Sequence, residues 1–129
     1  MLMNDEFGKF ILRQTLGILM LFHGVHKLIH GIDGIKGMVV NNGLPELFAY
    51  GVYVGEVVAP VMIILGLYAR VGALLIVVNM LLAIALAHPN ELFMLTQHGG
   101  WQLELQGFFL FTAVALFFTG PGAFSINRR

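Results

Sequence analysis

Residues 10–29 read FILRQTLGILMLFHGVHKLI, an apolar run long enough to cross a bilayer as one helix. A helix needs about 20 residues to cross the roughly 30 Å of hydrocarbon. The run nevertheless carries Arg13, His23, His26 and Lys27, and His30 follows directly after it. An ionisable side chain within a span costs roughly 2.5–3.5 kcal/mol on insertion scales, so such groups usually face the interior of a helix bundle. The stretch therefore predicts a membrane helix with one polar side turned toward partner helices.

The composition of the chain is that of an integral membrane protein. Hydrophobic residues make up 58 % of its 129 residues and charged residues 11 %, whereas a soluble domain carries about 25 % charged residues. The chain has no cysteine, which excludes disulfides and thiolate ligands, and its formal net charge of zero argues against a nucleic-acid partner. Asp5 and Glu6 precede the apolar run, so we do not expect a cleaved signal peptide. The expected surroundings of the chain are the lipid bilayer.

Four segments have the length and apolarity of membrane spans: residues 10–29, 47–67, 71–87 and 103–119. They predict an all-α fold, a membrane-spanning four-helix bundle that forms a single domain over residues 1–129. An even number of spans leaves both termini on one side, which carries most of the basic residues, namely Lys9, Arg13, Arg70, Arg128 and Arg129. The positive-inside rule then makes both termini cytoplasmic. We expect a multi-pass protein of the inner (cytoplasmic) membrane.

Polar residues form one stripe on the first span, and glycines form a second line beside it. At about 100° per residue, Arg13 and Lys27 fall on one line, with His23 and His26 on the same side. The glycines recur at heptad spacing, at Gly17, Gly24 and Gly31. Small residues let a second helix approach closely. The glycine line is therefore expected to pack inside the bundle, and it also permits a homo-oligomer.

Depth in the membrane predicts which polar groups meet. At 1.5 Å per residue, Glu56 and Asn79 lie near the middle of the second and third spans, and His23 lies at a similar depth in the first. We therefore expect these three to lie together, with His23 and Glu56 as the candidate catalytic residues, which would exchange protons. Lys27 and Glu104 both lie close to the outer surface, where we expect them to pair. The candidate ligand-binding residues are Lys27, Asn79, Glu104, Arg13 and His26.

Each of these groups also has a structural interpretation. The long side chains of Lys27, Arg13 and Arg70 can reach the membrane surface from near a helix end. Asn79 and Gln106 can serve as hydrogen bonds between helices. A metal site is a weaker alternative, built from His26 and His30 one helical turn apart with His88 as a third ligand. The adjacent Lys27 cation opposes a metal ion, so we predict no metal and no haem.

Three blocks of sequence together resemble the DoxX family of small four-helix membrane proteins. They are GILMLFHGVHKL at residues 17–28, Gly55-Glu56 followed by ILGLYARVGALL at residues 64–75, and TGPGAFSINRR at residues 119–129. The blocks occur in the expected order over nearly the whole chain. One departure is Asn127, which stands where the family commonly has Asp. The resemblance implies a four-helix bundle in the inner membrane. It also implies an association with membrane redox chemistry, because some relatives are described as subunits of a thiosulfate:quinone oxidoreductase or a terminal quinol oxidase.

These observations leave three hypotheses for function. The first is a redox component that binds a quinone or quinol within the bundle, with Lys27 stabilising developing oxyanion charge and a redox partner protein supplying electrons. The second is a non-catalytic scaffold or accessory subunit whose buried charges fix helix register and which recruits an enzyme. The third is a pathway for protons or small molecules along the polar track.

Overall fold

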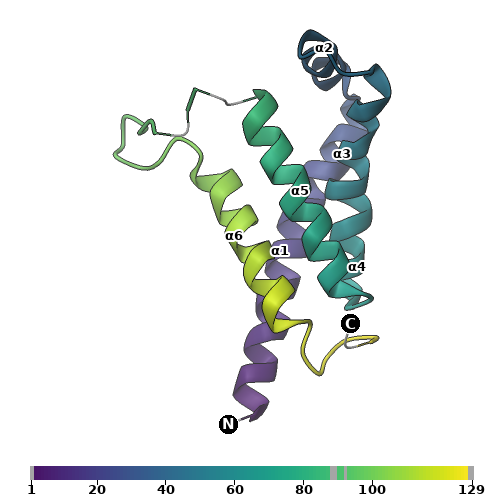
Figure 1. The fold of residues 1–129 in the computed structure, drawn as a ribbon. Coiled ribbons are helices and arrows are strands. Elements are labelled where there is room, and N and C mark those ends of the chain that lie inside the picture. Colours follow the sequence, from purple (N-terminus) through teal and green to yellow (C-terminus); the bar gives the residue numbers. More distant parts are fainter. Residues whose placement is uncertain (1, 88–89, 92, 128–129) are drawn as a thin grey trace.

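The computed structural model describes residues 2–87, 90–91 and 93–127, and this part of the chain is all-α. Its helical elements, in chain order, are α1 (Leu2–His30), α2 (Asp33–Asn41), η1 (Glu46–Tyr50), α3 (Gly51–Tyr53), η2 (Val54–Val58), α4 (Ala59–Leu65), α5 (Ala69–Ala87) and α6 (Glu104–Thr119). The elements η1, α3, η2 and α4 follow one another without a break, so that they form one long helix (Figure 1). Four long helices therefore stand where the sequence predicts four spans.

Length and composition mark some of these helices as membrane spans on their own. Among the described residues, two qualify: Glu46–Leu65 with 20 residues and Ala69–Ala87 with 19. The segment Asn4–His30 qualifies together with Asp33–Asn41, from which it is bent by 95°. The shorter apolar helix Glu104–Thr119 packs alongside them. Large apolar side chains such as Phe22, Phe108 and Phe118 are exposed on the outside of the bundle, as expected for a surface that faces lipid.

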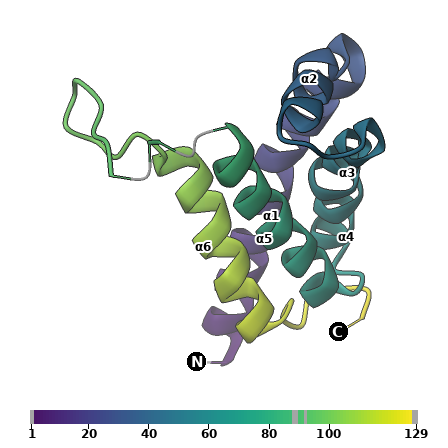
Figure 2. The same cartoon turned by 45° about the horizontal axis from the view of Figure 1, so that its top comes forward.

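The core of the bundle lies where the long helices pack on one another. Helix α6 packs along α5, and α4 packs against both α1 and α5 (Figures 1 and 2). The buried residues at this junction are apolar: Leu16, Met20, Ala59, Ile63, Ala73, Ile76, Met80, Phe109, Ala113 and Leu116. The N- and C-termini lie at the same end of the bundle (Figure 1). This arrangement agrees with an even number of spans, and the cytoplasmic location of that end stays a prediction.

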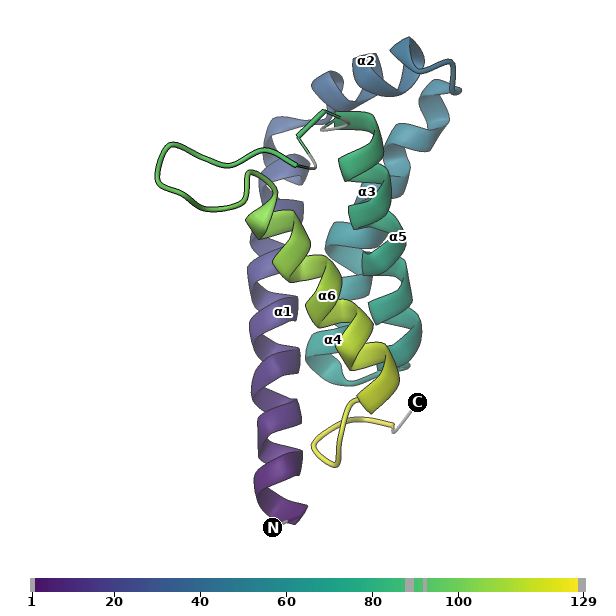
Figure 3. The same ribbon diagram turned by 60° about the vertical axis from the view of Figure 1, so that its left-hand side comes forward.

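Helix α2 lies between the first and second predicted spans, outside the four segments that the sequence predicts as helices. It lies across the end of the bundle opposite the termini (Figure 3). Gly31 and Gly43, at either side of α2, have φ values of +82° and +81°, a left-handed conformation that glycine adopts without strain. The buried side chains Ile32 and Val39 form a second apolar cluster with Ala49 of η1. This cluster holds α2 over the space between the long helices.

Two connections turn the chain at the end that holds the termini. Gly66, with φ +71°, ends α4, and Tyr68, with φ +47°, precedes α5, so the chain turns tightly between the two helices. After α6, residues 120–127 (the C-terminal segment) fold back beneath the bundle. The backbone N–H groups of Ile126 and Asn127 donate to the carbonyl oxygens of Leu65 and Gly66 at 3.2 Å each. The C-terminal segment thereby closes this end of the bundle.

Candidate functional site

A cavity of about 780 Å³ lies between the long helices on the side covered by α2. Its lining is mostly apolar and comes from α1, α2, the Glu46–Leu65 helix, α5 and α6. The polar residues in its wall are few: His23, Lys27, Glu56, Asn79 and Gln106. A largely apolar pocket of 300–1,000 Å³ with a small number of polar groups is typical of a small-molecule site.

Glu56 is the centre of the polar contacts at this cavity. Its side chain is buried, with the residue 4 % exposed, and both of its carboxylate oxygens have partners. The Lys27 ammonium forms an ion pair with Oε1, and the Asn79 amide Nδ2 donates to Oε2 at 3.0 Å. The hydroxyl of Tyr53 donates to the backbone carbonyl oxygen of Lys27 at 3.3 Å, which ties α1 to the helix that carries Glu56. A buried charge requires such pairing, because desolvation otherwise disfavours the ionised form.

Two glycines make these contacts geometrically possible. A Cβ atom at Gly24 would collide with the backbone carbonyl oxygen of Glu56, so α1 approaches η2 at a distance that only glycine permits. A Cβ atom at Gly55 would collide with the side chain of Asn79. Gly17 is also tightly packed, against Ile64, whereas a Cβ at Gly31 would have no described atom within 4 Å. The predicted glycine line therefore packs inside the bundle at Gly17 and Gly24, and self-association stays a prediction.

The predicted pair between Lys27 and Glu104 is wrong, because Lys27 pairs with Glu56. The predicted pair rests on the depths of the Lys27 and Glu104 Cα atoms, which leave out the length and direction of the side chains. Side chains of an α-helix point back toward its N-terminus, so the long side chain of Lys27 reaches from near the end of α1 toward the membrane centre. Glu104 is exposed at the first residue of α6. It borders a smaller hollow of about 460 Å³ on the outside of the bundle, with Leu12 and Trp101.

His23 shares the cavity wall with Glu56 and Asn79, and its ring lies edge-on to Phe109 with 5.6 Å between the centroids. The structure thus brings Glu56 and Asn79 into direct contact and places His23 beside the same cavity, while the assignment of roles to these residues stays a prediction. Gln106 of α6 also borders the cavity, although the sequence reading gave it only a structural part.

The candidate metal ligands lie on the outside of α1. The rings of His26 and His30 are exposed, with 4.3 Å between their centroids. His88 lies outside the described residues. Within the part of the chain that the structure describes, no group of three or more His, Asp or Glu side chains has the geometry to hold a metal ion.

Arg13 belongs to the opposite end of the bundle, away from the cavity. It is 1 % exposed, and its Nη2 donates to the backbone carbonyl oxygen of Phe124 in the C-terminal segment. Its guanidinium lies 5.6 Å from the centroid of the Phe10 ring. Its Nε and Nη1 atoms have no hydrogen-bond partner among the described residues. Arg13 is enclosed by the bundle and the C-terminal segment and does not line the cavity, so its predicted ligand-binding role has no support from its position.

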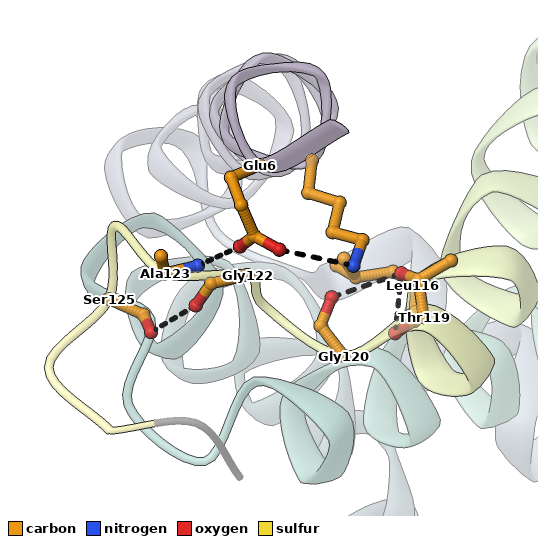
Figure 4. Close-up of polar contacts among 8 residues, drawn as sticks. Glu6, Leu116, Thr119, Gly120, Gly122, Ala123 and Ser125 are labelled. Atoms are coloured by element: carbon orange, nitrogen blue, oxygen red, sulfur yellow. Dashed lines mark hydrogen bonds and ion pairs between the residues drawn. The ribbon is translucent and has the colours of Figure 1, made fainter. Parts of the chain in front are cut away.

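Further polar contacts fasten the C-terminal segment beside Arg13. Glu6 accepts a hydrogen bond from the backbone N–H of Ala123 (Figure 4). It also pairs with Lys9 at 3.6 Å. Ser125 donates to the carbonyl oxygen of Gly122 at 2.8 Å within the segment (Figure 4). The side-chain oxygen of Asn127 accepts from the backbone N–H of Tyr68 at 2.9 Å. These contacts join the C-terminal segment to α1 and to the turn before α5.

Helix α2 contributes a part of the site that the sequence reading missed. Its residues Ile35, Met38 and Val39 line the cavity. Lys36 holds it to the next helix, with Nζ 3.8 Å from the Glu46 carboxylate and 5.0 Å from the centroid of the Tyr50 ring. A hydrogen bond with Tyr50, together with the nearby acidic groups, raises the pKa of Lys36. The spacing of Ile32, Ile35 and Val39 on one helical face is the signal that predicts such an element.

Comparison with known proteins identifies the family of the chain. No curated protein and no solved structure gives a significant match. The DoxX family profile matches residues 8–89, which include the glycine line of α1, Lys27, Glu56 and Asn79. The block at residues 119–129 lies beyond the matched range, so its resemblance to the family ending stays a prediction. The match covers more than half of the chain, and together with the apolar helices it shows that this multi-pass membrane protein belongs to the DoxX family.

Proposed function

We propose that the protein binds a quinone or quinol in the cavity between its helices and acts as a membrane component of an oxidoreductase. The observation that carries this proposal is the buried Glu56 carboxylate, which pairs with Lys27 and Asn79 in the wall of a largely apolar cavity of about 780 Å³. A quinone presents the complementary chemistry, with an apolar ring and two carbonyl oxygens that accept hydrogen bonds.

The donors for those carbonyl oxygens come from Lys27. An ammonium group has three N–H donors, and one of them is directed to Glu56. In the described part of the chain the other two have no acceptor, so they can donate to a ligand oxygen and stabilise negative charge that develops on it during reduction. Apolar residues such as Met20, Val52 and Phe109 supply the wall against which a ring packs.

Reduction of a quinone to a quinol consumes two electrons and two protons. His23 and Glu56 both border the cavity and are the candidate groups for proton transfer. The electrons come, in this proposal, from a redox partner protein or from a second reductant bound nearby. The protein then provides binding, orientation and proton transfer at the quinone.

Equilibrium titration of the detergent-purified protein with decylubiquinone tests the proposal. Wild-type protein is expected to show saturable binding that weakens about tenfold or more in Glu56→Gln and in His23→Ala, since about 1.4 kcal/mol corresponds to a factor of ten. Glu104→Gln is the matched control, because it makes the same chemical change at an exposed carboxylate away from the cavity. Absence of saturable binding, or equal affinity in all four proteins, contradicts the proposal.

A second candidate function is that of an accessory subunit that recruits a redox enzyme. The hollow of about 460 Å³ on the outside of α1 and α6, bordered by apolar residues that include Phe108 and Phe111, supports it because a partner helix can pack there. Affinity purification from native membranes distinguishes the two functions. A stoichiometric enzyme partner with an empty cavity supports the accessory role, as does loss of that partner in Phe111→Ala.

The third hypothesis, a proton or small-molecule pathway, makes a different prediction for the same residues. It requires flux into liposomes that contain the purified protein, and this flux must disappear in Glu56→Gln. Flux that is equal in protein-free liposomes removes this alternative.

A further inference from the structure

The helix that carries Glu56 contains one wide turn. Within the continuous helical stretch Glu46–Leu65, residues Val54–Val58 (η2) form a π-helical turn, and Glu56 stands at its middle. Single π turns inside α-helices are rare and occur frequently at functional sites. The position of this turn therefore calls for a cause in the sequence.

Pro60 provides that cause. In a regular α-helix the backbone N–H of residue 60 would donate to the carbonyl oxygen of residue 56, and proline has no N–H. A π turn pairs a carbonyl with the N–H five residues later, and here the N–H of Ala59, directly before Pro60, donates to the carbonyl oxygen of Val54. The proline ring also clashes with the carbonyl four residues earlier, which is that of Glu56 within the turn. Pro60 is itself fully buried at the start of α4. It thus removes the α-helical partner of the Glu56 carbonyl at the position where the turn widens.

The widened turn changes the direction in which Glu56 points. In an uninterrupted α-helix, seven residues advance about 700°, close to two full turns, so Glu56 would share a face with Ile63. Ile63 is buried in the apolar core beside Leu16 and Ile76. One extra residue in a turn displaces the side chains before it and after it by about 100° relative to each other. Glu56 lies inside the turn, so the turn sets its rotation relative to Ile63, and Glu56 is buried beside Lys27 of α1 and Asn79 of α5.

Close packing fixes the turn in this position. The Glu56 carbonyl oxygen lies against Gly24 of α1, and the backbone of Gly55 lies against the side chain of Asn79. Each contact has a glycine on one side, and a methyl group on either glycine would clash with the atoms opposite it.

We propose that Pro60 is a positioning residue of the cavity site: by withholding an N–H from the Glu56 carbonyl, it maintains the π turn that presents the Glu56 carboxylate to Lys27 and Asn79. The significance of this for ligand binding rests on the proposed function. The geometric claim concerns the Lys27–Glu56 pair alone, and it is tested without a ligand.

The test measures how strongly Lys27 and Glu56 are coupled, with and without Pro60. Lys27→Met, Glu56→Gln and the double variant are made in the wild-type and in the Pro60→Ala background, and Tm is measured in detergent. In the wild-type background, we expect the double variant to lose several degrees less than the sum of the two single losses. In the Pro60→Ala background, we expect this difference to fall to less than half. A proline that is merely structural lowers every Tm but leaves the difference unchanged, and that result overturns the proposal.

Two further variants keep the test decisive. Pro45→Ala is the matched control, since Pro45 precedes η1 at a position where no N–H is required, and the coupling should be retained there. If Pro60→Ala does not fold, Gly24→Ala displaces the same turn from the side of α1 and should reduce the coupling, while Gly8→Ala on the same helix should not. Retained coupling in Gly24→Ala overturns the proposal. If decylubiquinone does not bind to wild-type protein while the coupling depends on Pro60, the proposed function fails and the positioning role stands.

Discussion

Helix α1 carries two cations whose side chains have partners within the bundle, and the structure accommodates them in opposite ways. Lys27 pairs with the carboxylate of Glu56 at the wall of a large cavity. Arg13 donates to a backbone carbonyl of the C-terminal segment and packs against Phe10. The first arrangement leaves a charged group at a space that a ligand can fill, whereas the second closes one end of the bundle. A polar residue in a span is therefore informative about function only when its partner and its surroundings are known.

The largest effect is expected at the cavity, from Lys27→Met. Removing the cation leaves Glu56 buried without its charge partner, and breaking a buried pair in this way costs about 3–5 kcal/mol. The free energy of unfolding, measured by titration with SDS in mixed micelles, reports the loss. Lys27→Met/Glu56→Gln should recover most of it, because no unpaired charge remains. A loss below about 1 kcal/mol in Lys27→Met would show that the buried Glu56 carboxylate does not depend on Lys27 as its charge partner.

A smaller effect is expected from Gly55→Ala, which places a methyl group against Asn79. Overpacking of this kind costs about 1–3 kcal/mol. The matched control is Gly51→Ala in the same helix, where a Cβ would have no described atom within 4 Å. That substitution should leave stability unchanged or raise it by up to about 1 kcal/mol, because alanine favours a helix over glycine. Equal stability of the two variants contradicts the close contact between η2 and α5.

At the other end of the bundle, Arg13→Met should cost about 1 kcal/mol. It removes one hydrogen bond to the C-terminal segment, but it also removes a cation that has unpartnered N–H groups. Limited proteolysis should cleave the C-terminal segment faster in this variant, while decylubiquinone affinity should stay within a factor of about two of wild type, well below the tenfold that 1.4 kcal/mol would give. A loss of affinity as large as that of Glu56→Gln would show that the two ends do not have separate roles.

The smallest effect is expected from Asn127→Asp, which introduces the residue that the family commonly has. The side-chain oxygen of Asn127 accepts from the backbone N–H of Tyr68, and an aspartate retains that acceptor. We expect a change in stability within about 0.5 kcal/mol, as for most surface substitutions. Asn127→Ala removes the acceptor and should cost about 1 kcal/mol. If both variants are equally destabilised, the hydrogen bond to Tyr68 is not what Asn127 contributes.

The same comparison shows what can be predicted from sequence. The four long helices and the meeting of Glu56 with Asn79 are predictable, because the rise of a helix is regular and fixes the depth of each Cα. The partner of Lys27 was not predictable in this way, because a long side chain reaches beyond the level of its own Cα. The position of Arg13 depends on the path of the C-terminal segment, which backbone hydrogen bonds at Gly66 determine and no periodic pattern encodes. Pro60 is visible in the sequence, but the π turn that precedes it is seen only in the structure.

We propose that a ligand binds at the cavity end of the bundle and not at the end that holds the termini. Photo-crosslinking with an azidoquinone, followed by mapping of the labelled peptides, distinguishes the two ends. Label is expected in Glu46–Leu65 and Ala69–Ala87, lost in the presence of excess decylubiquinone and strongly reduced in Glu56→Gln but not in Arg13→Met. Label concentrated in residues 120–127, or spread over all helices and unaffected by competitor, would contradict it.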